Sequence, residues 1–166
     1  MTLHDTIRAL TNIDPKQIDA TVSGLQQARR VFAIGNGGGH AHASHFVSDL
    51  RHLANRDAYS FDNLGEITAR VNDDGWANAW SGWLTTSLFN PSRDLLFVFS
   101  VGGGNEAVSA NLVGAMELAD RVYGIVGAAG GEVARHGTPI VVPSFDTSII
   151  ESCQSVIAHL LVDCLR

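Results

Sequence analysis

The stretch VFAIGNGGG, residues 31–39, decides the fold of this 166-residue chain. Four apolar residues that end at a glycine predict a short buried strand. The glycines then form a loop, and a helical pattern runs from residue 40 to about residue 54. A strand, a glycine loop and a helix in that order are typical of the units that build a parallel sheet.

The same unit recurs along the chain. LLFVFSVGGGN, residues 95–105, contains a second apolar strand and a second glycine loop, and residues 106–119 continue as a helix. A third strand and glycine loop follow, and a helix over residues 149–165 closes the chain. The predicted strands lie within residues 31–34, 58–64, 95–99, 122–126 and 140–142. The pattern therefore predicts an α/β fold with a doubly wound, mostly parallel five-stranded sheet flanked by helices.

The region before the first strand is predicted to be helical over residues 3–28. Asp14-Pro15 marks a helix start, because Asp suits the N-cap and Pro the first helical position. A chain of this length is typical of one domain. We therefore expect a single domain over residues 1–166, with an N-terminal helical segment at 1–28 and an α/β core at 29–166.

Composition excludes several classes of protein. Hydrophobic residues make up 45% and charged residues 17%, which argues against disorder and leaves surface for partner subunits to bury. A net charge of −6 without a basic cluster argues against nucleic-acid binding. No apolar run is long enough to predict a membrane span. Cys153 and Cys164 form no disulfide framework, and residues 1–5 do not resemble a signal peptide, so we expect a cytoplasmic protein.

The glycine loops favour a site for an anion or a sugar. Ligands of such sheets bind at the carboxyl ends of the strands, where glycine exposes backbone N–H groups at the start of a helix. The dinucleotide motif G-x-G-x-x-G fails because His40 stands at its third glycine. A phosphate-binding G-x-x-x-x-G-K motif is excluded, since Lys16 is the single lysine. Tight structural turns remain the alternative for these glycines.

Two helices carry histidine–carboxylate pairs. His45 and Asp49 lie one turn apart on the first helix after a glycine loop, and Glu151 and His159 lie eight residues apart on the last helix. One imidazole and one carboxylate from each helix would supply four ligands suited to a zinc-like divalent ion. The same spacing is common in ordinary helix-face pairs, so the spacing alone leaves both interpretations open.

Taken together, these motifs resemble the phosphoheptose isomerases, a branch of the sugar isomerase (SIS) domain superfamily. GNGG at 35–38, followed by A-x-H-F-x-x-D-L at 43–50, resembles the family signature G-N-G-G-S…H-F-x-x-E-L. N-D-x-G at 72–75 matches a family motif, and SVGG at 100–103 is similar to its S-T-S-G loop. Glu151 and His159 stand where the family has Gln and His. The resemblance covers roughly residues 25–166.

This resemblance implies a flavodoxin-like three-layer SIS fold and an aldose–ketose isomerisation of sedoheptulose 7-phosphate through an enediol. It also implies cytoplasmic homotetramers with sites between subunits. Zinc, or another divalent metal, is expected at His45, Asp49, Glu151 and His159, with Asp49 and His159 as the acid–base pair. The expected sugar-phosphate contacts are Asn36, Gly37, Gly38, Gly39, Asn72, Asp73, Ser100, Val101, Gly102, Asn105 and Glu151.

The chain departs from the family pattern in its loops and its ligands. Gly39 replaces a serine, and three further hydroxyl-bearing positions of the second loop are now Val101, Gly102 and Asn105. Asp49 is one methylene shorter than the family's Glu, and Glu151 adds a charge that favours a divalent cation. Two alternatives follow from the changed loops: an isomerase for another sugar, or a non-catalytic SIS protein resembling the DnaA initiator-associating protein. Coordinating residues at all four metal positions favour an enzyme over the non-catalytic alternative.

Overall fold

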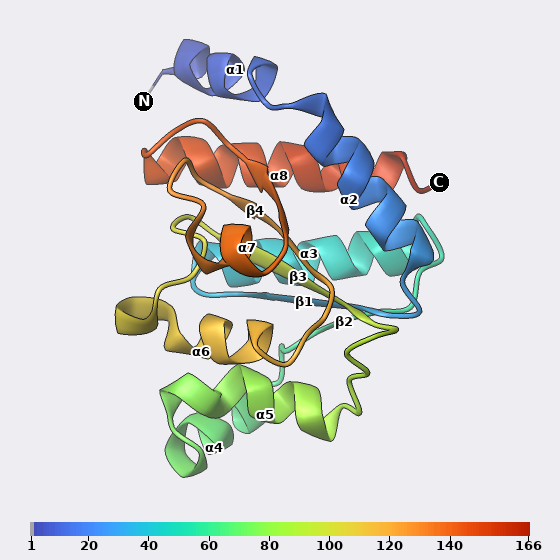
Figure 1. The fold of residues 1–166 in the computed structure, drawn as a ribbon, viewed down its shortest axis with the longest axis vertical. Helices are drawn as coiled ribbons and strands as arrows, with labels where there is room; N and C mark the ends of the chain where they lie inside the picture. The colour runs from blue at the N-terminus through green and yellow to red at the C-terminus, as the bar shows by residue number, and fades with distance from the viewer. Residues whose placement is uncertain (1) are drawn as a thin grey trace.

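A five-stranded sheet forms the centre of the computed structural model, which describes residues 2–166 (Figure 1). The strands run in the order β2-β1-β3-β4-β5, and each neighbouring pair is parallel. They are β1 (Val31–Gly35), β2 (Ala58–Ser60), β3 (Leu95–Ser100), β4 (Val122–Val126) and β5 (Thr138–Val141). The predicted doubly wound α/β sheet is therefore confirmed, and it is parallel throughout.

Helices cover both faces of the sheet, which makes three layers (Figure 1). Side chains of α3 and α8 pack on one face together with the N-terminal helices, and those of α5 and α6 pack on the other. The helices are α1 (Leu3–Thr11), α2 (Pro15–Gln27), α3 (Gly38–His52), α4 (Leu64–Asp73), the 3₁₀ turn η1 (Trp76–Asn78), α5 (Ala79–Thr86), α6 (Glu106–Met116), α7 (Gly131–His136) and α8 (Thr147–Asp163).

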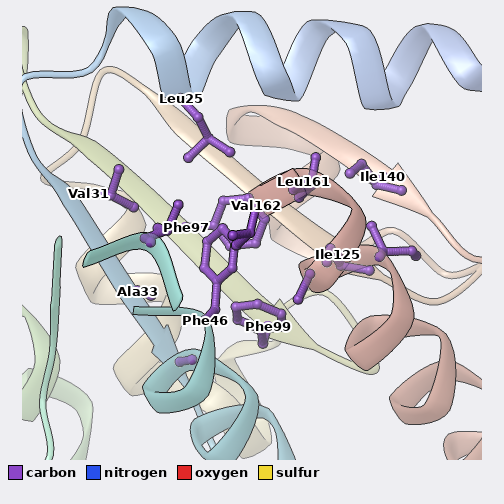
Figure 2. Packing of buried hydrophobic residues seen from close by; sticks show 14 of the residues in the cluster. Leu25, Val31, Ala33, Phe46, Phe97, Phe99, Ile125, Ile140, Leu161 and Val162 are labelled. Carbon is purple, nitrogen blue, oxygen red and sulfur yellow. The ribbon is translucent and has the colours of Figure 1, made fainter. Parts of the chain in front are cut away.

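Strand β3 shows why both layers form. Its residues are buried from Leu95 to Phe99, as expected of a central parallel strand. Because strand side chains alternate between the two faces, Phe97 and Phe99 join the cluster under α3 and α8 while Leu96 and Val98 join the opposite cluster. Figure 2 shows Phe46 of α3 lying against Phe97 and Phe99 in the first cluster. This packing holds α3 and α8 side by side.

The strand order places the two largest glycine loops together. From β1 the chain crosses to β2 at one edge and later returns to β3 on the other side of β1. This reversal is the topological switch point at which ligands of such sheets bind. Gly35 pairs with Phe99 in register, so the loops after β1 and β3 leave the sheet next to each other.

Some element boundaries differ from the sequence expectation. The expected helix over residues 3–28 is two helices, and Asp14 caps the second by accepting the Lys16 N–H. Helix α3 begins at Gly38, inside the predicted glycine loop. Helix α6 is kinked at Ser109, whose φ of −136° and ψ of 37° are not helical. Within residues 2–166, none of these helices has both the length and the apolar character needed to cross a bilayer.

Candidate active site

Three polar side chains from α3 and α8 meet at the surface of the molecule. His45 Nε2 lies 3.1 Å from His159 Nε2 and 3.2 Å from Asp49 Oδ2. The distance from His159 Nε2 to the same Asp49 oxygen is 3.6 Å. The three donor atoms all lie within 4.8 Å of one another, although the two histidines are 114 residues apart in sequence. The fold thus brings together three of the four residues predicted to bind a metal.

Core packing on both sides positions this group. Helix α3 turns Phe46 and Leu50 into the core, which leaves His45 and Asp49 at its edge. Helix α8 buries Ala158, Leu161 and Val162 in the same cluster, and Figure 2 shows the last two near Phe46. The imidazoles are more than half exposed, whereas the Asp49 side chain is only 18% exposed. A ligand from solvent can therefore reach all three donors.

This donor set fits a divalent cation. Catalytic zinc is held by three protein ligands and keeps a fourth position open, and two imidazole nitrogens with one carboxylate oxygen are a known set of such ligands. Two imidazole nitrogens at 3.1 Å attract each other only if one carries hydrogen or a cation lies between them. The geometry is therefore compatible with a three-ligand metal centre.

Glu151 lies apart from this group. A β-carbon on Gly38 would come within 2.5 Å of Glu151 Oε1, so the carboxylate rests on the first residue of α3. The N-terminus of a helix favours negative charge. Glu151 and His159 are eight positions apart on α8, which is about 12 Å along the helix axis. Glu151 as a fourth metal ligand consequently stays a prediction.

A cavity of about 170 Å³ opens beside this carboxylate, at the carboxyl ends of β1 and β3. It contains several of the residues predicted to contact the substrate. Its polar side chains are those of Asn36, Ser100, Ser109, Glu151 and Gln154. The remaining wall is made by Gly39, Phe99, Val101, Gly102 and Leu112. The cavity therefore lies where the topology places ligands, between the two glycine loops.

The glycines around this cavity have separable roles. A β-carbon at Gly39 would come within 2.5 Å of the Phe99 carbonyl oxygen, so glycine there lets α3 approach β3. Gly102 faces open space, which leaves its backbone free for a ligand. Gly104 has a φ of 91° and donates its N–H to Ser100 Oγ at 3.2 Å. The loops thus contain both tight structural turns and open backbone.

Asn36 is held by a partner that the sequence analysis missed. Asn36 Nδ2 donates to Asn111 Oδ1 at 3.0 Å, and Asn111 Nδ2 donates back to Asn36 Oδ1 at 2.7 Å. Asn111 is fully buried on the apolar face of α6. A polar residue within an otherwise apolar helix face is the signal that points to such a partner.

Ser109 and Gln154 also line the cavity and were not predicted. The kink of α6 at Ser109 is invisible in the apolar pattern of that helix. Gln154 is fully buried, and it lies one turn after Glu151 on α8. Its position on the face of Glu151 is the available sequence signal.

Other predicted contacts lie away from the cavity. Asn72 and Asp73 are exposed at the end of α4, where Asn72 Nδ2 donates to Asp73 Oδ1 at 2.7 Å. Asn105 caps α6 by accepting the Ala107 N–H at 2.7 Å. Gly37 and Gly38 are exposed at the start of α3 and do not line the cavity either. Substrate contact by these five residues remains a prediction.

His42 is a further titratable group on the first turns of α3. Burial lowers the pKa of its imidazole below the ordinary value of 6.5. The negative charge of Glu151 opposes this shift, and His45 adds to it. The ring lies 6.1 Å from that of Phe99, centre to centre. His42 is therefore favoured in its neutral form in the folded protein.

Comparison with curated proteins finds phosphoheptose isomerases. The enzyme of Mycobacterium tuberculosis is 31% identical over 150 residues, which cover 86% of this chain and 76% of that protein. The enzyme of Geotalea daltonii is 30% identical over 156 residues, or 90% of this chain and 80% of that protein. No family model matches the chain.

Solved structures agree with these relatives. A phosphoheptose isomerase from Francisella tularensis superposes with a TM-score of 0.82 at 25% identity, covering 99% of this chain and 98% of that one. A phosphoheptose isomerase from Neisseria gonorrhoeae shares the fold with a TM-score of 0.83 at 23% identity, over 98% of this chain and 93% of that one. The relatives, the shared fold and the switch-point site together lead to one assignment: this chain belongs to the phosphoheptose isomerase family of SIS-fold isomerases.

Proposed function

We propose that this chain interconverts an aldose phosphate and a ketose phosphate, with sedoheptulose 7-phosphate as its first candidate substrate. The observation that supports this most directly is the group of His45, Asp49 and His159 on α3 and α8, the two helices that also contribute to the wall of the glycine-lined cavity at the switch point. The relatives named phosphoheptose isomerase support the same substrate class.

We also propose that His45, Asp49 and His159 bind zinc or another divalent cation, because their donor atoms form a fitting ligand set. Glu151 remains the proposed fourth ligand from the sequence, in addition to its proposed contact with the substrate. Bound at this group, a cation would supply a Lewis acid that polarises a carbonyl or hydroxyl oxygen.

The proton transfers are assigned to Asp49 and His159. Aldose–ketose isomerisation moves one proton between neighbouring carbons and another between their oxygens, through an enediol. We assign one transfer to the carboxylate of Asp49 and the other to the imidazole of His159, whose reactive atoms lie 3.6 Å apart. Each positioned proton-transfer group contributes on the order of 10²–10⁴-fold to the rate.

The anionic end of the sugar is assigned to the loop after β3. Ser100, Val101 and Gly102 line the cavity there, and open space at Gly102 lets a phosphate approach the backbone. The α3 end is less suited to a phosphate, because the Glu151 carboxylate already lies on it. Asn36, the glycines at 37–39, Asn72, Asp73 and Asn105 complete the proposed set of sugar contacts.

A cytoplasmic homotetramer is the proposed assembly. Helix α8 exposes two apolar side chains around His159: Val156, three residues before it, is 50% exposed, and Leu160, directly after it, is 46% exposed. Burial of these side chains by another copy would stabilise an oligomer.

The test combines turnover with metal analysis. We expect the purified protein to convert sedoheptulose 7-phosphate, and both chelation and His159→Ala to abolish turnover and metal uptake. His136→Ala is the matched control, because His136 lies on α7 beside Glu132 and outside the site. Full turnover by metal-free protein would overturn the metal role. Lack of turnover of every sugar phosphate tested would favour the non-catalytic alternative.

A further inference from the structure

One buried polar atom of the candidate site has no partner. Gln154 of α8 is fully buried, and its Nε2 donates to the carbonyl oxygen of Ile125 in β4 at 2.9 Å. A carbonyl oxygen only accepts hydrogen bonds, so this contact fixes the amide with its nitrogen toward β4. The amide oxygen, Oε1, is shielded from solvent and has no hydrogen-bond partner in the part of the chain that the structure describes.

The same side chain lines the cavity between the two glycine loops. Gln154 follows Glu151 by one turn, so both residues lie on one face of α8. The Asn36 amide, which also lines the cavity, is already paired with Asn111. Among residues 2–166, no donor lies within hydrogen-bond distance of the Gln154 amide oxygen.

A buried acceptor without a donor is unfavourable, and a methionine or leucine of similar size would avoid the loss. Here the unpartnered acceptor belongs to a residue that lines the 170 Å³ cavity. A ligand that fills the cavity is thus the available source of a donor.

We propose that Gln154 is a substrate-orienting residue, whose Oε1 accepts a hydrogen bond from a sugar hydroxyl when substrate fills the cavity. This proposal rests on the isomerase function proposed above. A site built to bind one hydroxyl in this way discriminates against sugars in which that hydroxyl is missing. Gln154 consequently contributes to the choice among sugar phosphates, while Asp49 and His159 perform the proton transfers.

The test uses Gln154→Met, which keeps the length of the side chain and removes the amide. Ile157→Val on the same helix is the control, because Ile157 is buried outside the cavity. We expect Gln154→Met to lower kcat/KM for sedoheptulose 7-phosphate by about tenfold, the effect of one lost hydrogen bond. Ile157→Val keeps the wild-type value.

Monodeoxy analogues of the substrate identify the hydroxyl. For one analogue, wild type and Gln154→Met show the same kcat/KM, because the bond is absent in both. The proposal would be overturned if Gln154→Met lowered kcat/KM by the same factor for every analogue. It would also be overturned if Gln154→Met were as active as Ile157→Val. If Gln154→Met does not fold, Gln154→Leu replaces it in the same series.

A binding measurement tests the role of Gln154 independently of the proposed isomerase function. If the wild type turns over no sugar phosphate, the same comparison is made by calorimetry with sedoheptulose 7-phosphate and its deoxy analogues. Weaker binding by Gln154→Met, cancelled for one analogue, supports the assignment. Equal binding by both proteins, or no binding by the wild type, refutes it.

Discussion

The single substitutions Gly38→Ala and Gly39→Ala distinguish an effect on the candidate site from an effect on the stability of the fold. A β-carbon at Gly38 would lie 2.5 Å from Glu151 Oε1, whereas ordinary contact begins at 3.4 Å, so the carboxylate has to retreat by about 0.9 Å. A side-chain end can move at little cost, and alanine gains about 0.5–1 kcal/mol over glycine within a helix. We expect Gly38→Ala to change the free energy of unfolding by less than about 1 kcal/mol.

In Gly39→Ala the added methyl group would contact backbone instead of a side chain. Its β-carbon would lie 2.5 Å from the Phe99 carbonyl oxygen of β3, which moves only with the strand. Overpacking of this kind lowers the free energy of unfolding by about 1–3 kcal/mol. The two neighbouring substitutions therefore differ in stability, although they add the same methyl group.

Activity distinguishes the two variants in the other direction, because Gly38→Ala keeps its stability but is expected to lose turnover. Misplacing a site group by about 1 Å costs up to about 100-fold in rate, so Gly38→Ala is expected to lose most of its kcat/KM while it stays folded. Urea denaturation measures stability, and turnover of sedoheptulose 7-phosphate measures activity. Equal destabilisation of both variants, or full activity of Gly38→Ala, would refute the placement of Glu151 against Gly38.

Three further predictions concern other parts of the structure. Asp94 is fully buried and holds Arg30 at 2.6 Å, so Asp94→Ala lowers the free energy of unfolding by about 3–5 kcal/mol in urea, and a loss below 1 kcal/mol would contradict this. Burial lowers the pKa of His42, so its contribution to stability is complete above pH 6.5 and declines as the pH falls below that value. In urea titrations the wild type should therefore lose stability relative to His42→Gln as the pH falls below 6.5, and a stability difference that does not change with pH would contradict the lowered pKa. Asn111→Ala leaves Asn36 without its partner and lowers stability by about 1–3 kcal/mol together with kcat/KM. Val108→Ala, at an exposed position of the same helix outside the cavity, keeps most of both, and equal effects of the two substitutions would refute the role of the pair.

The sheet was predictable because its signals are local. The apolar runs at 31–34 and 95–99 are long enough to be buried on both faces, and each ends in a glycine loop. Strand order then follows from the few topologies that parallel α/β units adopt. The position of the ligand cavity was implied by the same loops.

The site was predictable only in part, because its details depend on contacts between distant segments. Helical periodicity placed Glu151 and His159 on one stripe of α8, yet the about 12 Å between them separates their side chains. The kink at Ser109 leaves no mark in the apolar pattern of α6, and the hydrogen bond of the Gln154 amide joins α8 to Ile125 of β4, a contact between distant segments. Even the pair of His45 and Asp49 gained its partner from a helix 114 residues away.

Because α3 and α8 share one donor group, metal binding there would make thermal stability depend on the supply of the ion. A cation bound by His45, Asp49 and His159 would tie the last helix to the middle of the protein, and unfolding would require its release. By mass action, a free ion at 100 times its dissociation constant adds about 2.7 kcal/mol to stability. In a cell short of that ion, such a protein would become less durable at the same time as it lost activity.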